Sequence, residues 1–164
     1  MGLLDRLSRL IEGLSLAGGW LAAAAILGIL ALVTLEVVLR TIFGFSTQVS
    51  DEFSGYLNVA AIYFGLAYAL KEGAFVRVEP VYKALRGPAA IAVRWVIVVA
   101  SLAYMAVTAW YFLHYAIGNF RSGVVSTNFS QTPLWIPQAF IVLGSALLVL
   151  QLAAYLLRGG RDVP

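Results

Sequence analysis

Four long stretches without a charged side chain make up most of this 164-residue chain and restrict what it can fold into. They cover residues 13–35, 53–70, 95–120 and 122–157. A hydrocarbon layer of roughly 30 Å is crossed by about 20 apolar residues of helix, so each stretch can supply one crossing. Lipid offers no hydrogen-bond partner to the backbone, so the crossings must be helical. We therefore predict an all-α integral membrane protein with four transmembrane helices.

Composition supports a membrane environment and gives no sign of an enzyme. Charged residues make up 12% of the chain, whereas soluble domains carry about 25%. The chain has no cysteine, which excludes disulfides and thiolate metal sites. We find no Walker motif, no phosphate-binding glycine loop, no metal-ligand cluster and no nucleophile–base pair, so we expect no catalytic residue, cofactor or metal. The basic residues lie beside the apolar stretches, which points to membrane topology and not to nucleic-acid binding.

The four spans are expected at about 14–35, 53–70, 95–118 and 134–157, within one domain over residues 1–164. Residues 71–94 form the longest connection. Pro80 can start an amphipathic helix within it, at about 80–92, whose shared face is Val81, Leu85, Ala89 and Val93 and which Gly87-Pro88 is expected to break. Residues 1–12 are also amphipathic. They form either a short helix that lies flat in the interface or the first turns of span one. One or two interfacial helices thus accompany the spans, and we expect span one to remain uncleaved.

The distribution of Lys and Arg predicts the orientation. Nine of the 11 basic residues lie in the N-terminal segment, the 71–94 connection or the C-terminal tail, and the other two are Arg40 and Arg121. Basic residues favour the cytoplasmic side of a membrane. We therefore place both termini and the 71–94 connection in the cytoplasm, and Arg40 and Arg121 on the opposite side.

Glu36 and Arg40 are the first ionisable residues to consider after span one. They are four residues apart and can pair on a helix. Ionisable residues inside a membrane are functional candidates. However, the 23 uncharged residues before Glu36 already span about 34 Å of helix. Glu36 can therefore reach the outer interface, and it is an interfacial partner of Arg40, a proton-coupling carboxylate or a residue without a special role.

Asp51 and Glu52 precede span two, where the helix dipole favours acidic groups. Ser50 or Asp51 is expected to cap the helix. Together with Glu36 and Arg40, these two carboxylates would also gather on the outer side and form a docking surface for a partner.

Span three holds two further candidates. His114 is the single histidine of the chain, so one chain cannot supply a bis-histidine haem site. We expect this histidine to be satisfied within the protein or to face a partner, rather than to bind a ligand. Trp110 lies in the middle of the span and suits a protein contact, whereas Trp95 and Trp135 lie near span ends, as interfacial anchors do.

Polar and small residues inside the spans indicate helix packing. Asn58 and Gln151 are isolated polar residues that can form hydrogen bonds between helices, worth roughly 0.6 kcal/mol each. Ala61, Gly65 and Ala69 are spaced four apart in span two. Such a stripe of small residues allows helices to approach closely.

Two segments, taken in order, point to a known family. The first is RTIFGFS at residues 40–46, followed by SDE at 50–52, Gly65 and KEGAFVRVE at 71–79. The second is TPLWIP at 132–137. This order resembles the small membrane subunit of the tripartite ATP-independent periplasmic (TRAP) transporters, the DctQ-like family. The chain departs from the family pattern at Val49 and Phe75, where Trp and His are common.

The resemblance implies a bacterial inner-membrane uptake system with three components. A large elevator-type subunit carries the substrate and sodium, and a soluble periplasmic protein captures an organic acid or acidic sugar. The small subunit would act as a lipid-anchored scaffold beside the large one and would help to dock the periplasmic protein. Arg40 and Glu52 match the motif and would have structural or interface roles, with Arg77 and Glu79 in the cytoplasmic counterpart.

Two other functions are open to a chain with four short spans. A self-contained small multidrug exporter uses a carboxylate near mid-membrane, which the position of Glu36 does not favour. A membrane anchor of a respiratory enzyme could not hold haem alone with one histidine.

Overall fold

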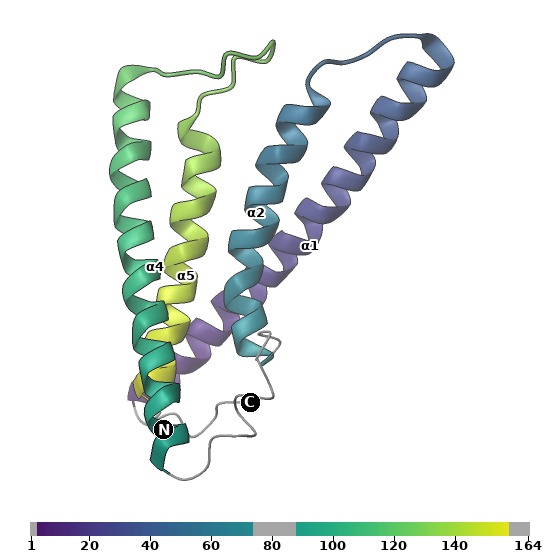
Figure 1. The fold of residues 1–164 in the computed structure, drawn as a ribbon. Coiled ribbons are helices and arrows are strands. Elements are labelled where there is room, and N and C mark those ends of the chain that lie inside the picture. Colours follow the sequence, from purple (N-terminus) through teal and green to yellow (C-terminus); the bar gives the residue numbers. More distant parts are fainter. Residues whose placement is uncertain (1–2, 74–87, 158–164) are drawn as a thin grey trace.

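The computed structural model describes residues 3–73 and 88–157, which form four helices (Figure 1). These are α1 (Leu3–Phe43), α2 (Ser50–Lys71), α4 (Pro88–Ser122) and α5 (Trp135–Leu157). Each helix is long and apolar enough to cross a membrane. The predicted all-α membrane fold with four spans is therefore confirmed.

The helices form two antiparallel pairs that meet through their inner members (Figure 1). The first pair is α1 with α2, and the second is α4 with α5. The helices α2 and α5 pack against each other, and α1 also contacts α5. As a result α1 and α4 are the outer helices. The N-terminal end of α1 and the C-terminal end of α5 lie at one end of the bundle, and the connections 44–49 and 123–134 lie at the other (Figure 1).

The helix α1 runs without a break over 41 residues, so residues 3–12 are its first turns and not a separate flat helix. At 1.5 Å per residue it is roughly 60 Å long, twice the thickness of the hydrocarbon layer. The second amphipathic segment, at 80–92, falls mostly on residues outside the described part of the chain. The helix α4 begins at Pro88, and the first turn of a helix tolerates proline.

Close approach of the backbones joins α1 to α2. A Cβ atom added to Gly18 would lie 2.9 Å from the carbonyl oxygen of Phe64, closer than a carbon and an oxygen can pack. The buried core of this contact comprises Ala22, Ala25, Ala60 and Phe64. The predicted stripe of small residues on α2 is only partly buried, although its Gly65 does face Ala22. The stripe therefore predicts close packing of α2. The residues of α2 that are buried in this contact, Ala60 and Phe64, each lie one position before a residue of the stripe.

The contact between α2 and α5 depends on a glycine as well. A Cβ added to Gly144 would lie 2.5 Å from the backbone carbonyl of Tyr63, so no larger residue fits without separating the helices. Beside it the rings of Phe64 and Phe140 pack at 6.1 Å between centroids. A second buried cluster comprises Ala67, Leu148 and Leu152. It lies toward the C-terminal ends of α2 and α5.

The connection from α4 to α5 starts with a helix-ending glycine. Gly123 has a φ of +62°, a conformation that glycine adopts without steric cost. The N–H of Val124 donates to the carbonyl of Asn119 at 3.1 Å, and the N–H of Gly123 donates to that of Phe120 at 3.4 Å. This is a Schellman motif, which satisfies carbonyls at the end of a helix.

Beyond Gly123 the chain forms a short hairpin. Val125 and Pro133 form an antiparallel bridge, and the N–H of Ser126 donates to the carbonyl of Thr132 at 2.8 Å. The hairpin extends from the α4–α5 pair toward the α1–α2 pair (Figure 1). It therefore brings hydroxyl side chains from the second half of the sequence close to the start of α2.

Candidate functional site

Polar contacts concentrate at the end of the bundle that carries the connections 44–49 and 123–134, which we call the loop end. Two carboxylates organise it, Glu36 from α1 and Glu52 from α2. Each is held by hydroxyl groups from a different connection, Glu36 by Ser46 and Thr47 and Glu52 by Ser130.

Glu36 binds the connection that follows its own helix. One of its carboxylate oxygens accepts a hydrogen bond from the Ser46 hydroxyl at 2.6 Å. The other accepts from the Thr47 backbone N–H at 3.1 Å and from the Thr47 hydroxyl. Hydrogen bonds to an ionised acceptor are about twice as strong as neutral ones. Glu36 therefore fixes the turn between α1 and α2.

The predicted pair between Glu36 and Arg40 is not formed. Although the two are one turn apart, the described part of the chain shows no ion pair between them. The hydroxyl and amide donors of residues 46 and 47 occupy the carboxylate instead. Arg40 is exposed in the last turn of α1, where the helix dipole favours a cation.

Glu52 joins the two halves of the bundle. It is only 8% exposed and accepts a hydrogen bond from Tyr56, one turn later on α2, at 2.5 Å. Its other oxygen accepts from the Ser130 hydroxyl at 2.6 Å, across 78 residues of sequence. Ser130 is also 2.8 Å from the hydroxyl of Thr132. Glu52 therefore ties the start of α2 to the hairpin between α4 and α5.

The start of α2 differs from the prediction in its cap. Val49 occupies the N-cap position and makes no side-chain capping bond, so neither Ser50 nor Asp51 caps the helix. Ser50 is buried in the first turn. Asp51 is exposed in the first turn, where its charge suits the dipole, as expected.

The loop end presents exposed side chains of two kinds. Arg40, Asp51 and Arg121 are exposed and charged. Phe129, in the hairpin, is 79% exposed, and Phe45 is also exposed. Aromatic residues and Arg are the side chains enriched in surfaces that contact another protein.

Two contacts hold the end of α4 against the start of α5. The Asn119 amide donates to the buried Gln138 side chain at 3.0 Å. The rings of Phe120 and Trp135 meet edge to face at 5.5 Å between centroids. Trp135 thus packs on α4, and Arg121 follows directly after this contact.

Within the spans, the predicted polar residues behave differently from one another. Asn58 is exposed on α2 and makes no hydrogen bond to another helix in the described part of the chain, which contradicts the prediction. His114 and Trp110 contact each other on α4, with ring centroids 4.1 Å apart. Both are exposed there.

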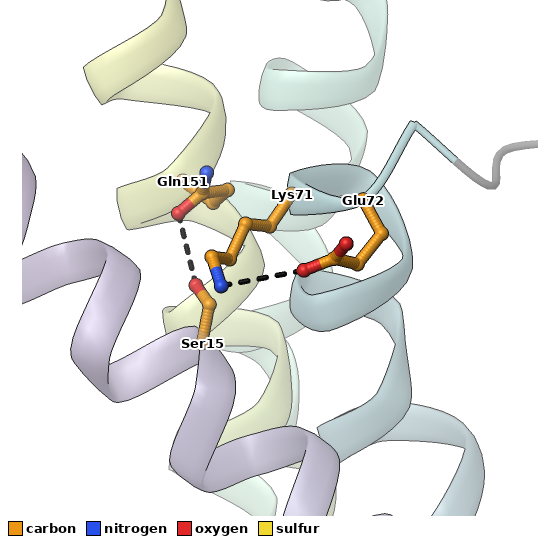
Figure 2. A network of polar contacts seen from close by, with 4 residues as sticks. All are labelled: Ser15, Lys71, Glu72 and Gln151. Carbon is orange, nitrogen blue, oxygen red and sulfur yellow. Dashed lines mark hydrogen bonds and ion pairs between the residues drawn. The ribbon is translucent and has the colours of Figure 1, made fainter. Parts of the chain in front are cut away.

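Gln151 forms the interhelical hydrogen bond predicted for it. Its side-chain oxygen accepts from the Ser15 hydroxyl at 2.9 Å, and both residues are buried. Figure 2 shows this bond between α1 and α5 beside the ion pair of Lys71 and Glu72 at the end of α2. Lys71 and Glu72 are 3.3 Å apart and partly exposed, so the pair contributes little to stability.

Arg77 and Glu79 lie outside the described residues. The hydroxyl donors Ser46, Thr47 and Ser130, which hold the two carboxylates, were not predicted from the sequence. For Ser130 the available signal is the high content of Ser, Thr and Asn in residues 119–133. Nothing in the sequence indicated which carboxylate these hydroxyls bind.

Comparison with known proteins adds one finding. The chain matches the family model described as "Tripartite ATP-independent periplasmic transporters, DctQ component" over residues 29–162. This range contains both connections of the loop end and the four helices, apart from the first part of α1. No match was found among curated proteins or among solved structures.

Proposed function

Because the chain belongs to the DctQ component family of the tripartite ATP-independent periplasmic transporters, we propose that it is the stationary scaffold subunit of a sodium-coupled importer. Its partners would be the large membrane subunit and a periplasmic substrate-binding protein. The cargo would be an organic acid or an acidic sugar, as the resemblance of residues 40–79 implies. The family match over most of the chain is the observation that carries this proposal.

The distribution of ionisable groups supports a scaffold role. The charge-free stretches of the sequence coincide with the apolar parts of the helices. Glu36 and Glu52 lie at the loop end, where hydroxyl groups hold them. Ion-coupled carriers place ionisable residues inside the membrane. In this bundle the two carboxylates hold loops in place. Such a bundle is suited to be the stationary subunit while the large subunit moves.

The multidrug exporter and the respiratory anchor have no supporting observation. An exporter carboxylate must lie where a substrate can reach it in mid-membrane. Glu36 instead contacts the connection 44–49 at the end of α1.

We also propose that both termini are cytoplasmic and that the loop end faces the periplasm, in the bacterial inner membrane. The ends of α1 and α5 that lead to the termini share one end of the bundle (Figure 1). Lys71 lies at that end as well. Most basic residues of the sequence belong to the segments at this end, which favours the cytoplasmic side.

With this orientation the loop end becomes the docking surface for the periplasmic protein. Arg40, Asp51 and Arg121 would supply charges for recognition, and Phe129 an apolar contact. Glu36 and Glu52 would act indirectly, by holding the two connections that carry this surface.

Reconstitution tests the scaffold proposal. Proteoliposomes would contain this chain, the large subunit or both, with an inward sodium gradient and the periplasmic protein loaded with a radiolabelled ligand. We expect accumulation only when both membrane chains are present. Sodium binding by the large subunit alone, measured in detergent, should persist. Accumulation by this chain alone, or loss of sodium binding from the large subunit in its absence, would refute a pure scaffold role.

A further inference from the structure

The outer face of α4 carries an unusual row of side chains. Tyr104 and Val107 are each 68% exposed and Tyr111 is 65% exposed, and the exposed His114 and Gly118 continue the row. We call these five residues the α4 seam. They recur at intervals of three and four residues, the spacing with which a helix presents one side to another helix. The seam lies opposite the contact of α4 with α5, which uses Leu102 and Met105.

The polar atoms of the seam lie deep in the span. The apolar part of α4 runs from Trp95 to Ser122, so its midpoint falls near residue 108. Tyr111 and His114 follow this midpoint by about 4 and 8 Å along the helix axis. Helical side chains lean toward the N-terminus, which carries the tips of both residues toward the middle of the membrane. They therefore cannot reach the headgroups, where exposed Tyr residues of membrane proteins usually lie.

His114 is fixed in a defined orientation. Its Nδ1 is 2.9 Å from the backbone carbonyl of Trp110, and its ring packs on the Trp110 indole at 4.1 Å. A carbonyl can only accept, so Nδ1 carries the proton, and in the neutral ring Nε2 is an acceptor. Within the described part of the chain no group donates to Nε2. An unmatched acceptor in hydrocarbon is unfavourable.

The outer face of α1 shows that exposure alone does not account for the seam. Leu27 and Leu30 of α1 are about as exposed as Tyr111, yet their side chains are aliphatic and are fully solvated by lipid. The seam instead carries the phenol of Tyr111 and the imidazole of His114 at depths where lipid supplies no hydrogen bond.

We propose that the α4 seam binds a transmembrane helix of the large transporter subunit, which donates a hydrogen bond to Nε2 of His114. This inference rests on the proposed function, which supplies the partner. A second copy of the chain fits less well. In a two-fold dimer of chains inserted the same way, residues at equal depth meet, so the His114 acceptor would face its own copy. A different protein is free to place a Ser, Thr, Asn or Gln donor there.

Site-specific photocross-linking tests the location. The photoreactive residue p-benzoylphenylalanine would replace Tyr111, or Leu30 as the control of similar exposure, in a tagged chain coexpressed with the large subunit. After irradiation of membranes, we expect the residue-111 variant to form an adduct with the large subunit and the residue-30 variant to form none. Adducts from residue 30 alone would overturn the inference. So would capture of a second copy, or no adduct from residue 111 while the unmodified chain copurifies with the large subunit. Failure of the unmodified chain to copurify would instead refute the proposed function together with this inference.

Substitution of His114 tests the hydrogen bond. His114→Leu removes the acceptor, and His114→Gln places an amide oxygen near the position of Nε2. We expect His114→Leu to weaken binding to the purified large subunit in nanodiscs about three- to tenfold, and His114→Gln to restore most of it. The thermal stability of the isolated chain should stay unchanged in both variants, because the hydrogen bond and ring contact of His114 are with its own helix. Equal binding by the native chain and His114→Leu would overturn the assignment.

Discussion

The two outer helices, α1 and α4, have the same overall position but different surfaces. The inner face of α1 buries small residues, including Ser15, Gly18 and Ala22, against α2 and α5. Its outer face is mainly aliphatic. By contrast α4 has no buried residue between Trp95 and Ser122, and its outer face carries Tyr and His side chains. The difference is that α1 buries one face within the chain, whereas α4 has an outer face with polar side chains, which we assign to a contact with another protein.

The largest difference in stability is expected between a glycine substitution on α1 and one on α4. Gly18→Leu would force a Cβ atom to within 2.9 Å of the Phe64 carbonyl oxygen, and should lower the free energy of unfolding by about 2–4 kcal/mol. Gly118→Leu on α4 meets open space and should leave the stability of the isolated chain unchanged or slightly higher, since leucine favours helix. Thermal unfolding in detergent, followed by size-exclusion chromatography, measures both. Equal losses from the two variants would abolish the contrast.

The two loop-end carboxylates should give an intermediate effect. Glu52→Ala leaves the Tyr56 and Ser130 hydroxyls without their shared acceptor and should cost about 1–3 kcal/mol of stability. Because Glu52 joins the two helix pairs, spin labels on residues 45 and 129 should also report a broader distance distribution. Glu36→Ala affects only its own connection and should cost less, without broadening the separation of the pairs.

Asp51→Asn serves as the control for this experiment. Asp51 is exposed beside Glu52, and its loss should change stability by less than about 0.5 kcal/mol. A larger loss from Asp51→Asn than from Glu52→Ala would show that the hydrogen bonds of Glu52 do not hold the halves together.

The smallest effect is expected from the buried bond between α1 and α5. A double-mutant cycle with Ser15→Ala and Gln151→Leu should give a coupling energy of about 0.6–1.7 kcal/mol. Unfolding in a graded mixture of detergents measures it. A coupling energy near zero would mean that the bond between Ser15 and Gln151 does not help to attach α1 to the bundle. The glycine and alanine contacts of α1 would then account for its attachment alone.

The sequence predicted the features that depend on local properties. Hydrophobic length gave the four helices, and the interhelical hydrogen bond of Gln151 followed from a lone amide in an apolar span. Its partner, Ser15, is 136 residues away, and no periodicity connects the two. The same limit explains Glu52 and Ser130, which meet only because the hairpin turns toward α2.

Competition between hydrogen-bond donors explains why the predicted pair of Glu36 and Arg40 does not form. Glu36 and Arg40 have the spacing of an ion pair, but Ser46 and Thr47 offer the Glu36 carboxylate three hydrogen bonds once the chain turns at residue 44. Gly44 has a φ of +64°, and no local pattern in the sequence predicts the direction of the turn that this allows. For Asn58, an isolated amide suggested a partner helix, yet its position on α2 faces away from α1 and α5.

The most direct test of the central claim, that this chain is an accessory subunit of a larger membrane complex, is native mass spectrometry of the tagged chain. The chain would be coexpressed with the large subunit and released from nanodiscs. The account predicts a complex of one copy of each. A chain that appears only alone or as a complex with itself, while the large subunit is folded and present in the same membranes, would contradict it.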